Sequence, residues 1–122
     1  VVRAMGVEDM WVVDAMDVKG VEEAIREAVA IDDRPTVVLV NGECVFVPEF
    51  RRRPVARVDH EVCNGCGFCF RVGCPAILKS DEVDEKTDRP KAEIDPLLCT
   101  GCTVCLQVCP RGAIYETETE EA

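Results

Sequence analysis

Hydrophobic residues follow three successive patterns in the first fifty positions. A short apolar run at 11–13 predicts a strand, and residues 17–31 place apolar side chains at the spacing of one helical face. Asp17 is placed to cap the start of that helix. The continuous apolar run 36–40 is typical of a strand buried on both faces of a parallel sheet. Strand, helix and strand together predict one β-α-β unit.

A β-α-β unit of this size buries too little surface to be stable alone. We therefore expect residues 1–50 to be the last piece of a larger α/β domain. Residues 1–6 resemble the end of a helix that stops at Gly6. The chain opens on Val1, which fits a truncated or processed product.

Short apolar segments recur from residue 58 onward and predict four short strands, which we expect to pair as antiparallel ribbons about an approximate twofold axis. These segments are 57–59, 76–78, 92–95 and 113–115. The charged stretch 79–91 holds one apolar residue, Val83, and predicts an exposed hairpin or loop. Residues 116–122 form an acidic tail.

The net charge of −10 argues against nucleic acid as a partner, because its phosphates would be repelled. No apolar run is long enough to span a membrane and no signal-peptide pattern is visible, so we expect a soluble, cytoplasmic protein without a membrane partner. The arginine-rich segment 51–57 lies between two acidic segments and predicts a basic linker. A clamp that holds the acidic segments together is the alternative interpretation.

Eight of the nine cysteines form two runs that begin 36 residues apart. In each run three cysteines recur at every third position, and a fourth precedes proline: Cys63, Cys66, Cys69 and Cys74, then Cys99, Cys102, Cys105 and Cys109. This spacing wraps a short loop around a [4Fe–4S] cluster. A zinc site would use separated Cys-x2-Cys pairs, and disulfides would suit a secreted chain. Two [4Fe–4S] clusters are therefore the preferred interpretation.

In two-cluster proteins with such runs, the fourth cysteine ligates the other cluster. We therefore expect Cys63, Cys66, Cys69 and Cys109 to hold cluster 1, and Cys74, Cys99, Cys102 and Cys105 to hold cluster 2. Gly65 and Gly101 should let backbone N–H groups approach the sulfides. The expected packing around the clusters is Val62, Phe68, Ile77, Ile94, Leu98, Val104 and Ile114. An anionic cluster in an acidic protein predicts a low reduction potential.

Four further residues receive structural interpretations. We expect Cys44, outside both runs, to be a buried structural thiol. We expect His60 to be a surface residue rather than a proton relay. Asp14 and Asp17 are interpreted as turn or capping residues rather than ligand-binding ones. No nucleophile–base pair, phosphate loop or paired carboxylate is evident, so no catalytic residue is predicted.

The chain resembles the C-terminal part of the large subunit of indolepyruvate ferredoxin oxidoreductase, a thiamine-diphosphate-dependent 2-oxoacid:ferredoxin oxidoreductase. The matching features are the helix end at Gly6, the 12–14 strand with Asp17, the 35–40 strand with Cys44, and the extended first loop, with four residues between Cys69 and Cys74. The resemblance implies an α+β chain. A β-α-β fragment of a thiamine-diphosphate-binding α/β domain (1–50) would precede, through the linker 51–57, a bacterial-type 2[4Fe–4S] ferredoxin-like domain (58–122).

The resemblance also implies a function. The chain would transfer electrons within an enzyme that oxidatively decarboxylates aryl pyruvates to acyl-CoA and reduces ferredoxin. Its partners would be the remainder of the large subunit, a small subunit and external ferredoxin. Thiamine diphosphate and magnesium would bind elsewhere, because the Gly-Asp-Gly motif is absent here. One alternative is a free-standing two-cluster ferredoxin, and another is an electron-transfer subunit of another 2-oxoacid oxidoreductase. A third is a non-redox binding or scaffold protein whose clusters only stabilise its fold.

Overall fold

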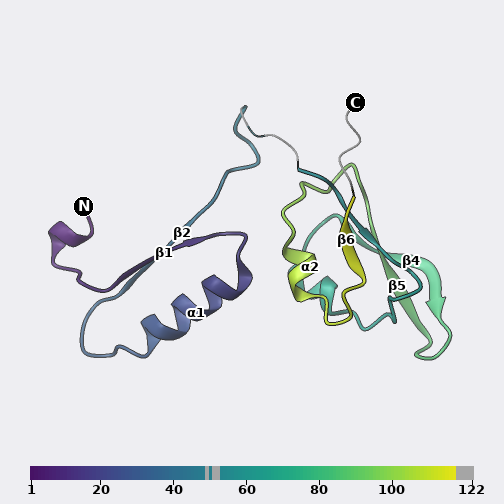
Figure 1. Ribbon diagram of the computed structural model, residues 1–122, viewed down its shortest axis with the longest axis horizontal. Helices are drawn as coiled ribbons and strands as arrows, with labels where there is room; N and C mark the ends of the chain where they lie inside the picture. The colour runs from purple at the N-terminus through teal and green to yellow at the C-terminus, as the bar shows by residue number, and fades with distance from the viewer. Residues whose placement is uncertain (49, 51–52, 118–122) are drawn as a thin grey trace. The chain divides into compact units, whose positions relative to one another are not determined.

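The computed structural model describes residues 1–48, 50 and 53–117. The chain divides into two compact parts, Val1–Pro48 and Glu49–Ala122, which are described separately (Figure 1). Part of the predicted linker, Arg51 and Arg52, and most of the acidic tail lie outside the described residues.

The first part has the predicted β-α-β order. A single turn of 3-10 helix, η1 (Arg3–Met5), is followed by β1 (Met10–Asp14), α1 (Val18–Val29) and β2 (Val37–Asn41). The two strands pair in parallel (Figure 1). The predicted stop at Gly6 is present, although the helix before it is only this one turn.

Helix α1 begins where the sequence predicts. Asp17 adopts an extended backbone conformation, and its Oδ1 accepts a hydrogen bond from Gly20 N at 3.0 Å, which confirms its capping role. The helix buries Ala24 and Ala28, two small side chains that allow close approach to the sheet. On the same side of the sheet, Trp11 Nε1 donates to a carboxylate oxygen of Glu27 at 2.7 Å.

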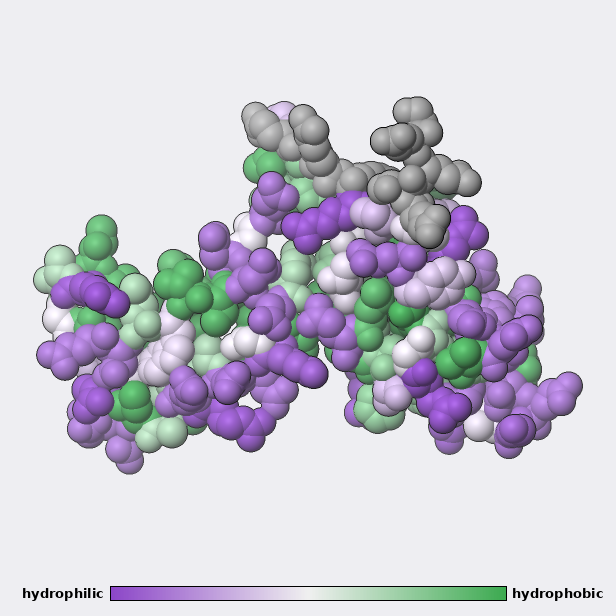
Figure 2. Space-filling model, viewed as in Figure 1, coloured by the Kyte–Doolittle hydropathy of each residue, from purple (hydrophilic) through white to green (hydrophobic). Residues whose placement is uncertain are grey.

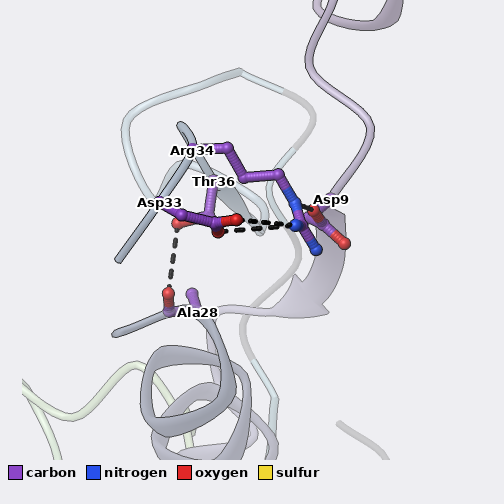
Figure 3. A network of polar contacts seen from close by, with 5 residues as sticks. All are labelled: Asp9, Ala28, Asp33, Arg34 and Thr36. Carbon is purple, nitrogen blue, oxygen red and sulfur yellow. Dashed lines mark hydrogen bonds and ion pairs between the residues drawn. The ribbon is translucent and has the colours of Figure 1, made fainter. Parts of the chain in front are cut away.

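The connection from α1 to β2 is held by polar contacts at its tip. Arg34 pairs with Asp9, just before β1, and also with Asp33 (Figure 3). The hydrogen bond and charge of Asp9 raise the pKa of Arg34 above its ordinary value. Thr36 Oγ1 donates to the carbonyl oxygen of Ala28 at 3.3 Å. These contacts join the end of the helix to the start of both strands.

The 36–40 strand is not buried on both faces, so that prediction was wrong for the chain as described. Val12 and Leu39 pair in register and remain 58% and 51% exposed. Strand residues alternate between faces, so these two point away from the side that Trp11 and α1 occupy. Only α1 packs on the sheet within the described residues, and apolar side chains therefore reach the surface of this part (Figure 2).

The second part contains the predicted antiparallel ribbons. Its elements are β3 (Ala56–Val58), a 3-10 helix η2 (Phe68–Val72), β4 (Ile77–Asp84), β5 (Arg89–Ile94), α2 (Val104–Val108) and β6 (Ile114–Glu116). Strand β3 pairs with β6, and β4 with β5 (Figure 1). The stretch 79–91 forms the predicted hairpin and is largely exposed.

The core of the second part is small, and most of its side chains are alanine or cysteine. Its buried members are Ala56, Cys69, Ala76, Ile77, Ala92, Ile94, Cys99, Cys105 and Ile114. Among the described residues no large side chain falls below 2% exposure. No helix in the described ranges is long and apolar enough to cross a membrane.

Candidate iron–sulfur centres

Two of the cavities in the second part are each lined by four cysteines. Cavity 1 takes three cysteines from the first run and one from the second: Cys63, Cys66, Cys69 and Cys109. Its other walls include Phe70, Ala92 and Ile114. The cysteine from the second run therefore completes a ring of sulfur atoms around a pocket that the first loop builds.

Cavity 2 has the reciprocal composition. Its cysteines are Cys74 from the first run and Cys99, Cys102 and Cys105 from the second. Ala56, Ile77 and Ile94 contribute apolar walls. Each cavity thus brings together one of the two ligand sets that the crossed assignment requires.

The cysteines are arranged around a space rather than around a point. All nine are free thiols. Within the described ranges, no three His, Cys, Asp or Glu side chains converge closely enough to hold a single metal ion. A [4Fe–4S] cluster instead needs one thiolate at each of four iron corners. Four cysteines spread around an apolar cavity fit this cofactor.

Burial raises the pKa of one buried cysteine in each cavity. Desolvation, followed by the charge of Cys63, raises the pKa of Cys69. Desolvation, followed by the charge of Cys102, raises the pKa of Cys105 to about 11. Four thiolates in an apolar pocket are therefore unfavourable unless a cation offsets them, and the iron of a cluster would supply that positive charge.

An aspartate before each cysteine run accepts hydrogen bonds that hold the start of the loop. The carbonyl oxygen of Asp59 accepts from Cys63 N at 2.9 Å, and that of Asp95 accepts from Cys99 N at 3.0 Å. Each Oδ1 also accepts a backbone N–H two residues on, at 2.8 Å in both loops. The sequence analysis did not single out these residues. Their signal was the shared position four residues before the first cysteine.

The glycines that precede the second cysteine of each run have positive φ angles, +65° at Gly65 and +72° at Gly101. A Cβ on Gly65 would lie 2.8 Å from the carbonyl oxygen of Arg89, and one on Gly101 would lie 2.6 Å from that of Pro54. Each loop therefore packs directly against a neighbouring backbone segment. These positions need glycine for conformation and for space.

The predicted packing around the clusters is partly present. Ile77, Ile94 and Ile114 are buried at the cavities. Val62, Phe68 and Leu98 are 37%, 48% and 51% exposed, so their prediction was wrong. Each of these three residues directly precedes a cysteine, and the tight loop turns its side chain outward. Phe70 and Leu106 pack against the core instead.

Three other predicted residues have definite positions. Cys44 is exposed, in a turn after β2 that no described residue covers, so the prediction of a buried thiol was wrong. Asp14 Oδ1 accepts from Met16 N at 2.7 Å, as expected for a turn residue. His60 is half-buried: its Nε2 lies 3.1 Å from the carbonyl oxygen of Ala92, which lines cavity 1.

Backbone amides also reach the sulfur atoms. Ala56 N donates to Cys99 Sγ at 3.5 Å. An N–H donor stabilises the thiolate form of a ligand and favours the more reduced, more negative state of a cluster. This contact spans 43 residues of sequence and attaches β3 to the second run.

Comparison with known proteins agrees with this geometry. Residues 62–113 match the model of the 4Fe-4S dicluster domain. The chain is 40% identical over 116 residues to indolepyruvate oxidoreductase subunit IorA of Methanothermobacter marburgensis, which covers 93% of this chain and 17% of that protein. It is 36% identical over 83 residues to subunit IorA of Pyrococcus horikoshii, covering 63% of this chain and 13% of that protein.

The relative from Thermococcus kodakarensis, also an indolepyruvate oxidoreductase subunit IorA, is 36% identical over 89 residues, covering 67% of this chain and 14% of the relative. The chain thus spans less than a fifth of the length of the curated relatives it matches. The cofactors of the second part are [4Fe–4S] clusters. The chain is therefore a relative of indolepyruvate oxidoreductase subunit IorA, and its residues 62–113 are a 4Fe-4S dicluster domain.

Proposed function

We propose that this chain conducts electrons through two [4Fe–4S] clusters as part of an indolepyruvate-type ferredoxin oxidoreductase. The observation that supports it best is the reciprocal composition of the two cavities, each with three cysteines from one run and one from the other. Cluster 1 would be held by Cys63, Cys66, Cys69 and Cys109, and cluster 2 by Cys74, Cys99, Cys102 and Cys105.

When bound, each cluster would supply one-electron chemistry. The protein contributes the thiolate ligands, the apolar walls and the N–H donors. Ile77 and Ile94 exclude water from cavity 2, and Phe70 and Ile114 do the same for cavity 1. Ala56 N supplies a fixed donor to a ligand sulfur. These groups need no rearrangement when an electron arrives, because they are already in place.

Residues 1–50 are, in this proposal, the C-terminal β-α-β fragment of a larger α/β thiamine-diphosphate-binding domain. Parallel sheets carry helices on both faces, whereas the described sheet has one face uncovered. The relatives are several times longer than this chain, so they have the length to cover it. Residues 51–57 then form the linker, although β3 already begins at Ala56. Residues 58–122 form the ferredoxin-like domain.

The chemistry at the 2-oxoacid would take place outside this chain, where thiamine diphosphate and magnesium would bind. The enzyme would oxidatively decarboxylate aryl pyruvates to acyl-CoA. The partners would be the remainder of the large subunit, a small subunit and an external ferredoxin that accepts the electrons. We expect the complex to be cytoplasmic.

The ligand assignment can be tested with single Cys→Ser variants of anaerobically purified protein. Wild type should contain about eight irons per chain. In the crossed assignment Cys74 and Cys99 are both ligands of cluster 2. Cys74→Ser and Cys99→Ser should therefore both lose cluster 2 and retain the electron paramagnetic resonance signal of cluster 1. Cys109→Ser and Cys63→Ser should leave the other signal. Cys44→Ser is the control and should retain all iron. If Cys74→Ser instead resembles Cys63→Ser, each run holds its own cluster.

The enzymatic role needs the complete oxidoreductase. Adding indolepyruvate and coenzyme A without oxygen should reduce the clusters and produce their paramagnetic signals. Omitting coenzyme A is the control for turnover. A chain that purifies without partners, and whose clusters exchange electrons only with soluble reductases, would support the free-standing ferredoxin instead.

A further inference from the structure

Asn64 carries a buried polar atom that the protein leaves without a partner. Asn64 is one of the residues that line cavity 1. Among the described residues, Asn64 Oδ1 is the one fully buried side-chain oxygen or nitrogen with no hydrogen-bond partner. A buried polar group without a partner is unfavourable by about 1–3 kcal/mol, so such groups require an explanation.

The backbone of Asn64 is fixed from outside the loop. Thr87 Oγ1, in the β4–β5 turn, donates to the carbonyl oxygen of Asn64 at 2.8 Å. Thr87 is in turn held by Asp84, whose Oδ2 accepts from Thr87 N at 2.9 Å. The backbone of Asn64 is therefore held at the wall of the cavity.

The two ends of an asparagine amide are almost identical in shape, and their assignment follows from the partners available. Turning the amide by half a rotation places the NH2 group where Oδ1 stands. Cluster sulfides and thiolates are acceptors only, and a filled cavity 1 would present them to this wall. An N–H donor on Asn64 would then be satisfied, whereas a carbonyl oxygen would remain unpaired.

The matching position of the second loop is different. Thr100 occupies it, between the first two cysteines of its run, and lines cavity 2. Neither Thr100 nor Thr103 has a fully buried, partnerless hydroxyl in the described part of the chain. The two loops share the spacing of their first three cysteines and the glycine before the second cysteine. Residue 64 is therefore a position at which the two repeats differ chemically.

We propose that Asn64 donates its side-chain amide to a sulfur of the cluster in cavity 1 and raises that cluster's reduction potential. A hydrogen bond to sulfur disperses negative charge and favours the reduced state, which carries one more electron. This inference rests on the proposed placement of a cluster in cavity 1. Asn64 acts through the sulfur atom and is a positioning residue rather than a ligand.

Voltammetry of the anaerobic full chain tests the effect, with one electron delivered to each cluster by the electrode. Asn64→Leu should shift one of the two waves to lower potential and leave the other unchanged. The expected change is roughly tenfold in the reduction equilibrium, or about 59 mV for one electron. Thr100→Val, the matched control, should not move the wave that Asn64→Leu moves. Iron analysis giving about eight irons per chain establishes that both clusters are present.

A spectroscopic measurement needs no variant that could misassemble. The sequence holds two asparagines, Asn41 and Asn64. Labelling the asparagine side-chain amide with ¹⁵N should produce a hyperfine coupling to a reduced cluster. The coupling should persist in Asn41→Gln, and its absence from wild type overturns the proposal. Unchanged waves in Asn64→Leu at full iron content also overturn it, whereas low iron in wild type would contradict the cluster assignment itself.

Discussion

His60 Nδ1 lies 2.9 Å from Glu82 Oε2, and this pair joins the first cysteine loop to the β4–β5 hairpin. The other ring nitrogen faces the carbonyl oxygen of Ala92 at 3.1 Å. Lys91 Nζ also reaches Glu82 Oε2, at 3.4 Å. Glu82 is thus the carboxylate that His60 and Lys91 share.

Replacing Glu82 with Gln should lower thermal stability slightly at neutral pH, because the contacts of its carboxylate with His60 and Lys91 are lost. The effect should be small, since Glu82 is exposed, and should shrink in high salt. Melting followed by circular dichroism measures it. Glu85→Gln is the control, because Glu85 lies in the same hairpin and has no ion pair among the described residues.

The same contact predicts a pH dependence. The hydrogen bond from His60, and then that from Lys91, lower the pKa of Glu82 from its ordinary value of 4.5. A carboxyl with a lowered folded pKa stabilises the fold above its unfolded pKa and loses this contribution as pH falls through the folded value. The difference between wild type and Glu82→Gln should therefore be full at neutral pH, begin to fall near pH 4.5 and vanish only below the lowered folded pKa. A difference that grows in acid would contradict it.

Gly65→Ala should destabilise the protein more than Gly73→Ala. Both glycines have positive φ, so both variants lose roughly 1–2 kcal/mol from backbone conformation. At Gly73 a Cβ meets nothing within 4 Å, whereas at Gly65 it meets the Arg89 backbone at 2.8 Å. The comparison isolates the steric part. Loss of cluster absorbance on heating provides the measurement, and equal effects would show that the loop can move away.

Removing iron should unfold the second part of the chain. Its buried core is largely alanine and cysteine, and three of its nine members are the larger isoleucine, so little apolar area remains without the clusters. Treatment with a chelator and an oxidant should abolish the far-ultraviolet circular dichroism of a fragment covering residues 53–122. Reconstitution with iron and sulfide should restore it. A cooperative melt of the iron-free fragment would contradict this expectation.

Residues 1–48 should not fold by themselves. The two-stranded sheet leaves Val12 and Leu39 uncovered, and α1 exposes Ile25 at 48% and Val29 at 75%. A fragment of these residues should show no cooperative thermal transition by circular dichroism. Substituting Ser for Leu39 should then make no difference in the fragment. In the complete large subunit it should destabilise, because there the side chain would be buried.

The order of strands and helices could be predicted because each depends on local rules. Asp17 begins α1 as an N-cap, and the apolar run 36–40 places β2 within one residue. The crossed sets were expected because two-cluster proteins with such runs share their fourth cysteines, and the cysteines of each set line one cavity. Side-chain exposure was less predictable. Phe68 and Phe70 flank the same cysteine, Cys69, and only the 3-10 turn decides that Phe70 is the one that lines cavity 1.

Contacts between distant segments could not be predicted in this way. The pairing of His60 with Glu82 depends on where the hairpin folds back over the loop. The exposure of Cys44 depends on what covers the end of β2, which a local pattern of apolar residues does not report.

The reciprocal arrangement of the cavities has a consequence for how such a repeat can evolve and assemble. Cys109 closes cavity 1 and Cys74 closes cavity 2, so neither half of the duplication can complete its own pocket. Cutting the polypeptide between the two halves would leave each cavity without one of its four cysteines. Insertion of either inorganic core should therefore wait until both halves of the duplication have been synthesised and have folded together.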